Sequence, residues 1–206
     1  MPRRARFLED HAYYHVLSRS TNQTWIFRDP ADFGKCRALL LEAKRMFPIK
    51  LFHYAIMSTH FHLVIQVEQK EWLARHLAHV KWGYTYWMRQ KYRWRGPLWR
   101  ERFKSLPIRN EEYLTACGRY VELNPVHAGI CTDPAAYPYS SASKYVRGTP
   151  DPLVDDYSPH PLSPEVNAWL HGPHLATAYT PPNVLFEPFH RGDSHLGDKG
   201  GVYCRG

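Results

Sequence analysis

Three segments of the chain carry their apolar residues in the pattern of β-strands. Residues 13–20 mix β-branched and aromatic positions with polar ones in near alternation, and residues 49–57 and 60–67 are two apolar runs. Ser58 and Thr59 alone separate the second run from the third, and so short a polar link predicts a hairpin. We therefore expect these segments to belong to one antiparallel sheet.

Three further segments repeat apolar residues at helical spacing, which predicts helices over 33–47, 70–94 and 110–124. Residues 102–109 predict a fourth strand, and Pro107 places it at an edge because proline has no N–H for a ladder hydrogen bond. The order is strand, helix, strand, strand, helix, strand, helix. It indicates an α+β fold in which helices cover an antiparallel sheet.

The ends of two of these helices carry specific signals. Asp29 or Asp32 can cap the first helix, and Pro48 ends it. Asn110 is expected to cap the third helix, and Pro125 to lie just beyond its last residue.

The amino-acid composition of the chain changes near residue 149, where proline-rich and then glycine-rich stretches replace the periodic segments. We expect a folded domain over residues 1–148 and an acidic tail over 149–206, irregular or wrapped over that domain.

The distribution of charge is more informative than its total. Residues 1–150 contain 24 Lys and Arg against 12 Asp and Glu, whereas residues 151–206 contain 3 against 7. A basic domain that is also rich in Trp and Tyr favours nucleic acid as a partner, because cations neutralise phosphates and flat rings stack on bases. A solvated basic surface is the alternative.

Composition argues against other classes of protein. The chain has no run of about 20 apolar residues, the length that spans a bilayer, and its basic N-terminus lacks the apolar core of a secretory signal. A cytoplasmic location without a membrane partner is therefore expected. The four cysteines are widely spaced and fit neither a zinc ribbon nor a disulfide framework, so we interpret them as reduced thiols.

The first candidate chemical group is a pair of histidines in the stretch STHFHLV, residues 58–64. Residues two apart on a strand point to the same side, so His60 and His62 project together while Phe61 packs on the other side. Two neutral imidazoles at this spacing can share one cation. A polar strand face without a metal is the alternative, and the spacing alone does not decide between them.

The second candidate group lies on the predicted helix over 110–124. Tyr120 and Asn124 are four residues apart and share a helical face, with Tyr113 two turns earlier. A phenol becomes a useful nucleophile when its electrophile is already polarised, and an amide oxygen can be a metal ligand. The alternative is that Tyr120 packs in the core and Asn124 caps the helix. Tyr113 is interpreted as a packing residue.

Four motifs occur together in one order, namely THFHLVI (59–65), GPLWRERFKS (96–105), YLTACGRYVELNPVHAG (113–129) and YPYSS (137–141). With these motifs the chain resembles, over residues 6–147, the REP-associated tyrosine transposases. These belong to the single-tyrosine HUH endonucleases, together with the transposases of simple single-strand insertion sequences. The resemblance implies a ferredoxin-like HUH domain that cuts and rejoins single-stranded DNA at hairpin-associated sites.

The resemblance also implies roles for individual residues. His60, His62 and Asn124 hold a divalent metal, Mg²⁺ or Mn²⁺, as the cofactor. Tyr120 attacks the DNA phosphate and forms a 5′-phosphotyrosine, leaving a 3′ hydroxyl that can reverse the step. His127 stands where the family motif has an arginine that contacts phosphate.

Basic residues interleaved with aromatic ones predict the DNA-binding surface. They lie in an N-terminal arm, at the end of the first strand and in the segment 88–104. The residues expected to contact DNA are Arg3, Arg4, Arg6, Arg19, Arg93, Arg95, Trp99, Arg100, Arg102 and Lys104. The alternative places Trp99 in the core and leaves the arginines to solvate a helix end.

Two rival functions are weighed against this one. The first is a domesticated protein that binds a DNA hairpin without cutting it, and a complete set of His60, His62, Tyr120 and Asn124 argues against it. The second is a hydrolase with zinc on the histidine pair, which no HExxH motif or third His or Cys at matching spacing supports. We expect no small-molecule substrate, and both a monomer and a homodimer are compatible with the sequence.

Overall fold

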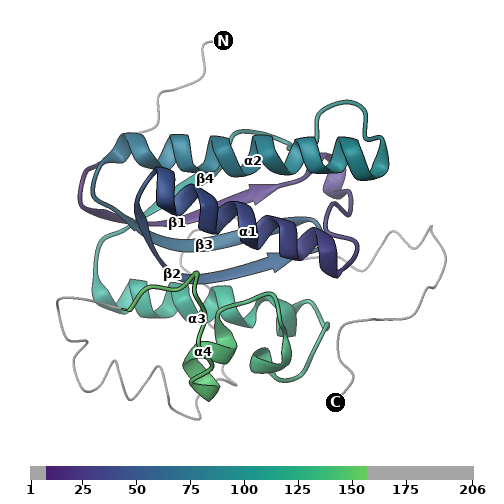
Figure 1. Cartoon of the computed structure of the whole chain (residues 1–206). Coiled ribbons are helices and arrows are strands. Elements are labelled where there is room, and N and C mark those ends of the chain that lie inside the picture. The colour runs from purple at the N-terminus through teal and green to yellow at the C-terminus, as the bar shows by residue number, and fades with distance from the viewer. Residues whose placement is uncertain (1–7, 157–206) are drawn as a thin grey trace.

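The computed structural model describes residues 8–156, and its elements follow the order expected from the sequence (Figure 1). The strands are β1 (Ala12–Arg19), β2 (Ile49–Met57), β3 (His60–Val67) and β4 (Lys104–Ile108). The α-helices are α1 (Pro30–Met46), α2 (Lys70–Tyr92), α3 (Glu111–His127) and α4 (Ala142–Arg147). Short 3₁₀ segments, η1 (Thr21–Gln23) and η2 (Pro134–Ala136), lie in the connections.

The four strands form one antiparallel sheet in the order β2-β3-β1-β4. The hairpin of β2 and β3 is confirmed, with Met57 opposite His60 across the two-residue link. The edge position of β4 is also confirmed. Because β1 lies beside β3, Arg19 stands opposite His60 and Leu17 opposite His62. This pairing decides which side chains reach the histidine pair.

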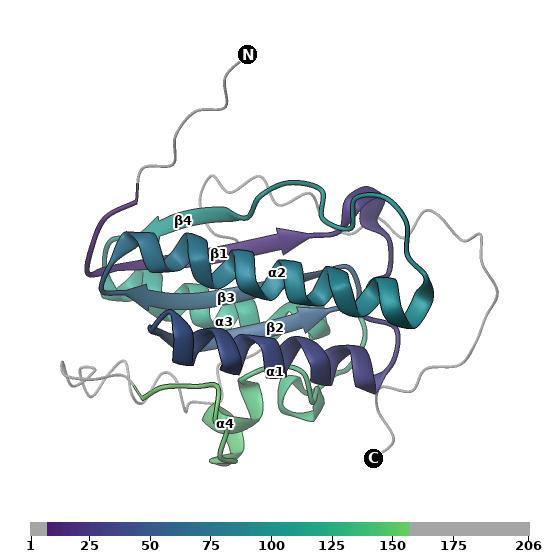
Figure 2. The ribbon, with the colours of Figure 1, turned by 45° about the horizontal axis from the view of Figure 1, so that its top comes forward.

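The sheet separates two layers of helices. Helices α1 and α2 lie side by side over one face, and α3 covers the other (Figures 1 and 2). The face beneath α1 and α2 carries the main core, which includes Val16, Phe61 and Leu63. Phe61 therefore packs inward as predicted. The face beneath α3 carries a smaller apolar cluster, in which Val64 and Val121 take part.

The N-caps of α1 and α3 are residues that the sequence predicted. Asp29 is the N-cap of α1, and its Oδ1 accepts a hydrogen bond from the backbone N–H of Asp32 at 3.1 Å. Asp32 is fully buried and joins α1 to α2, because its carboxylate accepts hydrogen bonds from Trp87 Nε1 at 2.9 Å and Lys91 Nζ at 2.9 Å. Asn110 caps α3 as predicted.

The first residues of the expected tail pack against the domain. Leu153 and Val154 are buried in the main core. Asp155 Oδ2 accepts hydrogen bonds from Lys44 Nζ at 2.6 Å and from the backbone N–H of Leu51 at 2.7 Å. The stretch up to residue 156 is thus held against α1 and β2, and the rest of the predicted tail lies outside the described residues.

Across residues 8–156, every helix is too short or too polar to cross a membrane.

Candidate active site

His60 and His62 project from the face of β3 that α3 covers. Their ring centroids are 5.0 Å apart, with the rings edge to face. His62 is 1% exposed, whereas His60, at the end of the strand, is half-buried. The two-residue period of the strand thus brings two imidazoles together, one deep and one reachable from outside.

Burial keeps both imidazoles neutral. Burial, together with the positive charge of Arg19 across the strand pair, lowers the pKa of His60 to about 3. The pKa of His62 is well below its ordinary value because of burial and then the neighbouring His60, His15 and Arg19. A neutral imidazole is the form that binds a metal ion.

His15 on β1 is a third histidine that sequence reasoning did not select. It is 2% exposed, and its Nε2 lies 2.9 Å from His62 Nδ1. The two rings are nearly parallel, with centroids 5.1 Å apart. His15 lies within the first predicted strand, but the local pattern does not tell that this strand pairs with the one that carries His62.

Helix α3 is seated on the sheet by a buried polar group. Glu122 Oε1 accepts hydrogen bonds from His53 Nδ1 on β2 at 2.8 Å and from Ser141 Oγ at 2.7 Å. Gly118 faces the same imidazole so closely that a Cβ there would lie 2.5 Å from His53 Nε2. These contacts fix the rotation of α3, and with it the direction in which Tyr120 points.

Tyr120 packs from α3 against two buried histidines of the sheet. Its ring centroid is 5.9 Å from that of His62 and 6.0 Å from that of His15, in both cases edge to face. The exposed His127, two turns further along α3, has its ring centroid 6.5 Å from that of Tyr120. The structure therefore brings together the predicted nucleophile and the predicted metal ligand His62.

The phenol of Tyr120 is protonated at neutral pH. Burial raises its pKa to about 12, while the positive charge of Arg19 and a hydrogen bond from the Asn124 side chain act in the opposite direction. Both groups that favour the phenolate belong to the residues expected at the site.

The end of α3 differs from the prediction, which placed it at Asn124 because proline usually follows a helix. The helix continues through Pro125 to His127. Asn124 Nδ2 donates to the carbonyl of Tyr120 at 2.8 Å and lies 3.4 Å from that of Val121, which Pro125 has no N–H to satisfy. The side chain of Asn124 thus supplies a hydrogen bond that the proline lacks, and the metal-binding role of its amide oxygen stays a prediction.

Arg19 lies between the histidine pair and the basic segment. Its Nε is buried and has no hydrogen-bond partner within residues 8–156. Its carbonyl accepts a hydrogen bond from the backbone N–H of Arg100 at 3.0 Å, and Ser20 forms a bridge with Trp99. The connection between α2 and β4 is thereby held at the same end of the sheet as His60.

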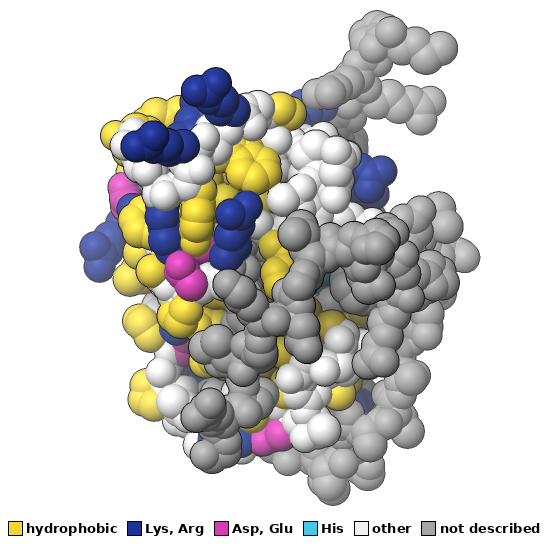
Figure 3. Space-filling model, turned by 90° about the vertical axis from the view of Figure 1, so that its right-hand side faces the viewer, with side chains coloured by type: hydrophobic (Ala, Val, Ile, Leu, Met, Phe, Trp, Pro, Cys, Tyr) yellow, Lys and Arg dark blue, Asp and Glu magenta, His cyan; other side chains and the backbone are white. Residues whose placement is uncertain are grey.

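This connection, together with Lys104 at the start of β4, carries most of the residues expected to contact DNA. At this end of the molecule Lys and Arg side chains alternate with hydrophobic ones on the described surface (Figure 3). Of the residues expected to contact DNA, those exposed here are Arg93, Arg95, Arg100, Arg102 and Lys104. The predicted contacts of Arg3, Arg4 and Arg6 lie outside the described residues.

Trp99 is packed rather than displayed. Its indole Nε1 donates to the carbonyl of Lys81 and to Thr85 Oγ1, both at 3.1 Å. Its ring meets Phe61 edge to face, with centroids 5.7 Å apart. This environment favours the core interpretation of Trp99, and its expected contact with DNA stays a prediction.

The residues present fit a divalent cation. His60 Nδ1 lies 2.8 Å from Thr59 Oγ1, and His62 Nδ1 is engaged with His15, so a cation would be held through Nε2 of each ring. In the part of the chain that the structure describes, no three His, Cys, Asp or Glu side chains are grouped to hold a metal ion. The predicted donor set, two imidazoles and the amide oxygen of Asn124, has the nitrogen and oxygen donors that divalent transition-metal ions accept.

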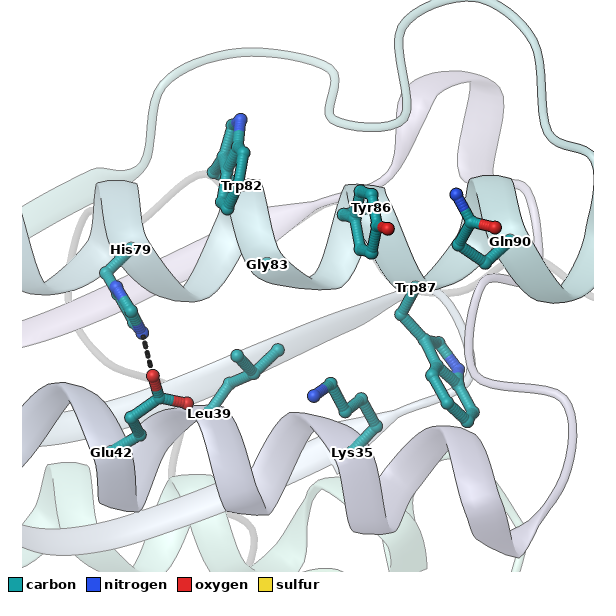
Figure 4. Close-up of a pocket in the computed structure, with 9 residues that line it drawn as sticks. All are labelled: Lys35, Leu39, Glu42, His79, Trp82, Gly83, Tyr86, Trp87 and Gln90. Atoms are coloured by element: carbon teal, nitrogen blue, oxygen red, sulfur yellow. Dashed lines mark ion pairs between the residues drawn. The ribbon is translucent and has the colours of Figure 1, made fainter.

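A cavity of about 250 Å³ lies elsewhere, between α1 and α2 (Figure 4). Trp82 and Tyr86 project side by side from α2, with ring centroids 6.1 Å apart, and both are exposed. His79 Nε2 lies 3.2 Å from Glu42 Oε1 on α1. The cavity is across the sheet from Tyr120 and separate from the candidate active site.

Comparison with known proteins gives one family and one well-matched fold. Residues 9–124 match the family model of IS200-like transposases. The structure of a REP-associated tyrosine transposase bound to a REP hairpin is similar, with a TM-score of 0.62 and 17% sequence identity. That similarity covers 79% of this chain and 96% of the other, and it confirms the α+β fold.

A crystal structure of a candidate transposase from Deinococcus radiodurans is also similar, with a TM-score of 0.41 and 16% identity, over 59% of this chain and 96% of the other. The curated proteins contain no match to the chain.

Proposed function

The chain belongs to the family of IS200-like transposases, and from this premise we propose that it cuts and rejoins single-stranded DNA at hairpin-associated sites. The proposed nucleophile is Tyr120, and the proposed metal-binding residues are His60, His62 and Asn124. The proposed product of cleavage is DNA linked through its 5′ phosphate to Tyr120.

The observation that carries this proposal is the placement of Tyr120 against His62, one of the two histidines on β3. The phenol ring lies in edge-to-face contact with the imidazole of His62, with centroids 5.9 Å apart, so the proposed nucleophile and a proposed metal ligand are neighbours. The contacts of Glu122 and Gly118 with the sheet hold the helix in this orientation before DNA arrives. Prepositioned reacting groups lower the entropic part of a barrier.

A divalent cation, when bound by His60, His62 and Asn124, would draw negative charge from the scissile phosphate. Two nitrogen ligands are more than Mg²⁺ usually accepts, because it prefers an all-oxygen shell. Manganese tolerates imidazole, so we expect Mn²⁺ to support activity at least as well as Mg²⁺.

Arg19 has two proposed roles in the reaction. Its positive charge lowers the pKa of the Tyr120 phenol against the effect of burial, which favours the nucleophilic phenolate. The buried Nε that has no hydrogen-bond partner among the described residues is a donor suited to a phosphate oxygen.

The proposed cleavage by Tyr120 needs no reactant other than the protein and the DNA. Tyr120 Oη forms a bond to phosphorus as the bond from phosphorus to the 3′ oxygen breaks. The phenolic proton leaves, and the departing 3′ oxygen gains a proton. The phosphotyrosine ester keeps the energy of the broken bond, so a 3′ hydroxyl can attack it and restore the DNA strand.

The basic segment provides the proposed path of the DNA. Arg100, Arg102 and Lys104 are exposed at the end of the sheet where Arg19 and His60 lie. They would neutralise the backbone that leads to the scissile phosphate. One solved structure of similar fold is a REP-associated tyrosine transposase bound to a REP hairpin, and this supports a hairpin as the ligand here.

A covalent-trapping experiment tests this function. A labelled DNA hairpin with a single-stranded flank is incubated with protein and Mn²⁺ and run on a denaturing gel. We expect a labelled protein band with wild type and with Tyr113→Phe, and none with Tyr120→Phe. Tyr113 is a matched control because it lies two turns earlier on α3.

A parallel binding measurement separates the rival function. If wild type binds the hairpin at nanomolar to micromolar concentration yet forms no adduct with either metal, the protein is a hairpin binder. An adduct that persists in Tyr120→Phe would show that another residue is the nucleophile.

A further inference from the structure

The contact between His15 and His62 has a chemical consequence for metal binding. His15 lies at the centre of β1, opposite Val64 on β3 and Leu106 on β4. Its Nε2 is 2.9 Å from His62 Nδ1. Both rings are almost completely buried, with 2% and 1% of their surfaces exposed, so bulk water does not reach this hydrogen bond.

A hydrogen bond between two neutral imidazoles needs one N–H and one lone pair. When His62 Nδ1 carries the proton, His15 Nε2 accepts it and His62 Nε2 has a lone pair for a cation. When His15 Nε2 is the donor, the proton of His62 is on Nε2, and that nitrogen cannot bind a metal. The direction of one hydrogen bond therefore decides whether His62 is a ligand.

We propose that His15 is a positioning residue that accepts a hydrogen bond from His62 Nδ1 and thereby holds His62 Nε2 ready for the metal. This inference rests on the proposed function, since it gives His62 the role of ligand. A hydrogen-bond acceptor behind a metal-bound imidazole fixes both its tautomer and its ring orientation.

His15, the partner of His62, differs from Thr59, the partner of His60, in the contacts that it makes. Thr59 Oγ1, which lies 2.8 Å from His60 Nδ1, is a hydroxyl that can turn to donate or accept. The ring of His15 is nearly parallel to that of His62, with an angle of 21° between the planes. It also meets Tyr120 edge to face at 6.0 Å between centroids. His15 thus contacts a ligand and the nucleophile at once.

The test compares three variants for Mn²⁺ affinity in the absence of DNA. His15→Gln places an amide oxygen where Nε2 was and keeps an acceptor, whereas His15→Leu keeps volume and removes it. His76→Leu is the matched control, because His76 is a buried histidine on α2, which covers the other face of the sheet. Isothermal titration calorimetry of each full-length protein gives the affinity.

We expect His15→Leu to weaken Mn²⁺ binding about 10–100-fold, the usual effect of removing such a partner. His15→Gln should stay within about threefold of wild type, and His76→Leu should bind like wild type, because neither change removes an acceptor from His62. Wild-type affinity in His15→Leu would overturn the proposal.

Nitrogen-15 NMR of the imidazoles reads the tautomer directly in the wild-type protein and needs no variant to fold. We expect the His62 proton on Nδ1, and its presence on Nε2 would overturn the proposal. A wild type that binds Mn²⁺ with this tautomer but forms no covalent adduct with DNA would contradict the proposed function and leave the role of His15 intact.

Discussion

The fit of α3 against the sheet can be tested by changing Gly118 to alanine. The added Cβ would lie 2.5, 2.7 and 2.8 Å from three atoms of the His53 ring. That ring is fully buried and is held by Glu122, so it has no open space to move into. Either the helix shifts away from β2 or the hydrogen bond between His53 and Glu122 is distorted.

The expected magnitude combines two opposing effects. Overpacking of a buried site costs about 1–3 kcal/mol, and replacing glycine by alanine within a helix stabilises it by about 1 kcal/mol. The net loss in the free energy of unfolding is thus up to about 2 kcal/mol, which lowers the melting temperature by up to roughly 8 °C in a chain of this length. Because Gly118 lies two residues before Tyr120, covalent trapping at 25 °C should also slow.

Gly34→Ala is the matched control, since Gly34 lies within α1 with no other group near its Cβ position. It should raise the melting temperature by roughly 2–4 °C through helix propensity alone. Differential scanning calorimetry measures both changes. Gly118→Ala should therefore melt below Gly34→Ala, and a Gly118→Ala protein that gains as much stability as Gly34→Ala would refute the close seating of α3 on His53.

Three other predictions follow from the same structure. Arg19→Gln should slow covalent trapping about 100-fold in a time course, as loss of a donor to a reacting phosphate does. Arg109 is exposed at the far end of β4, and Arg109→Gln should react at the wild-type rate. Burial acts to raise the pKa of Asp32, but hydrogen bonds from Trp87, Lys91 and Arg28 outweigh it and lower the pKa, as hydrogen bonds led by Lys91 lower that of Asp29. The stability that these carboxylates contribute is therefore present above about pH 4 and is lost as the pH falls through their lower folded pKa values. In urea titrations at several pH values, Asp32→Asn should show a smaller fall in the free energy of unfolding below pH 4 than wild type. An equal fall in both proteins would contradict this prediction. The double variant Arg102→Gln with Lys104→Gln should lower the salt slope of single-strand binding by about 1.4, near 0.7 for each lost phosphate contact, whereas Arg75→Gln on the exposed side of α2 should leave the slope unchanged in fluorescence anisotropy.

Local patterns were sufficient where neighbours in sequence are neighbours in space. The strands 49–57 and 60–67 have the predicted bounds, because the Ser58-Thr59 link makes a hairpin and the apolar runs end with it. The end of α3 was predicted wrongly, since the amide of Asn124 offsets the missing N–H of Pro125. Proline is expected to end a helix because it lacks a backbone N–H. That expectation does not consider a side chain that donates the missing hydrogen bond.

The candidate site was only partly predictable for a related reason. The period of β3 places His60 and His62 together, and the family resemblance singled out Tyr120 on a helix. Sequence reasoning did not identify His15, because its role depends on β1 lying next to β3 and no local signal encodes that order. The hydrogen bond between Glu122 on α3 and His53 on β2 also joins residues that are far apart in sequence, so no local signal predicts it.

The most direct test of the central claim is to locate the covalent bond between protein and DNA. The adduct formed with hairpin DNA and Mn²⁺ is digested with protease and nuclease and sequenced by mass spectrometry. We predict one modified peptide, with Tyr120 linked to the 5′ phosphate of the downstream DNA. Modification of Tyr113 or of another residue, or a link through a 3′ phosphate, would contradict the proposed mechanism.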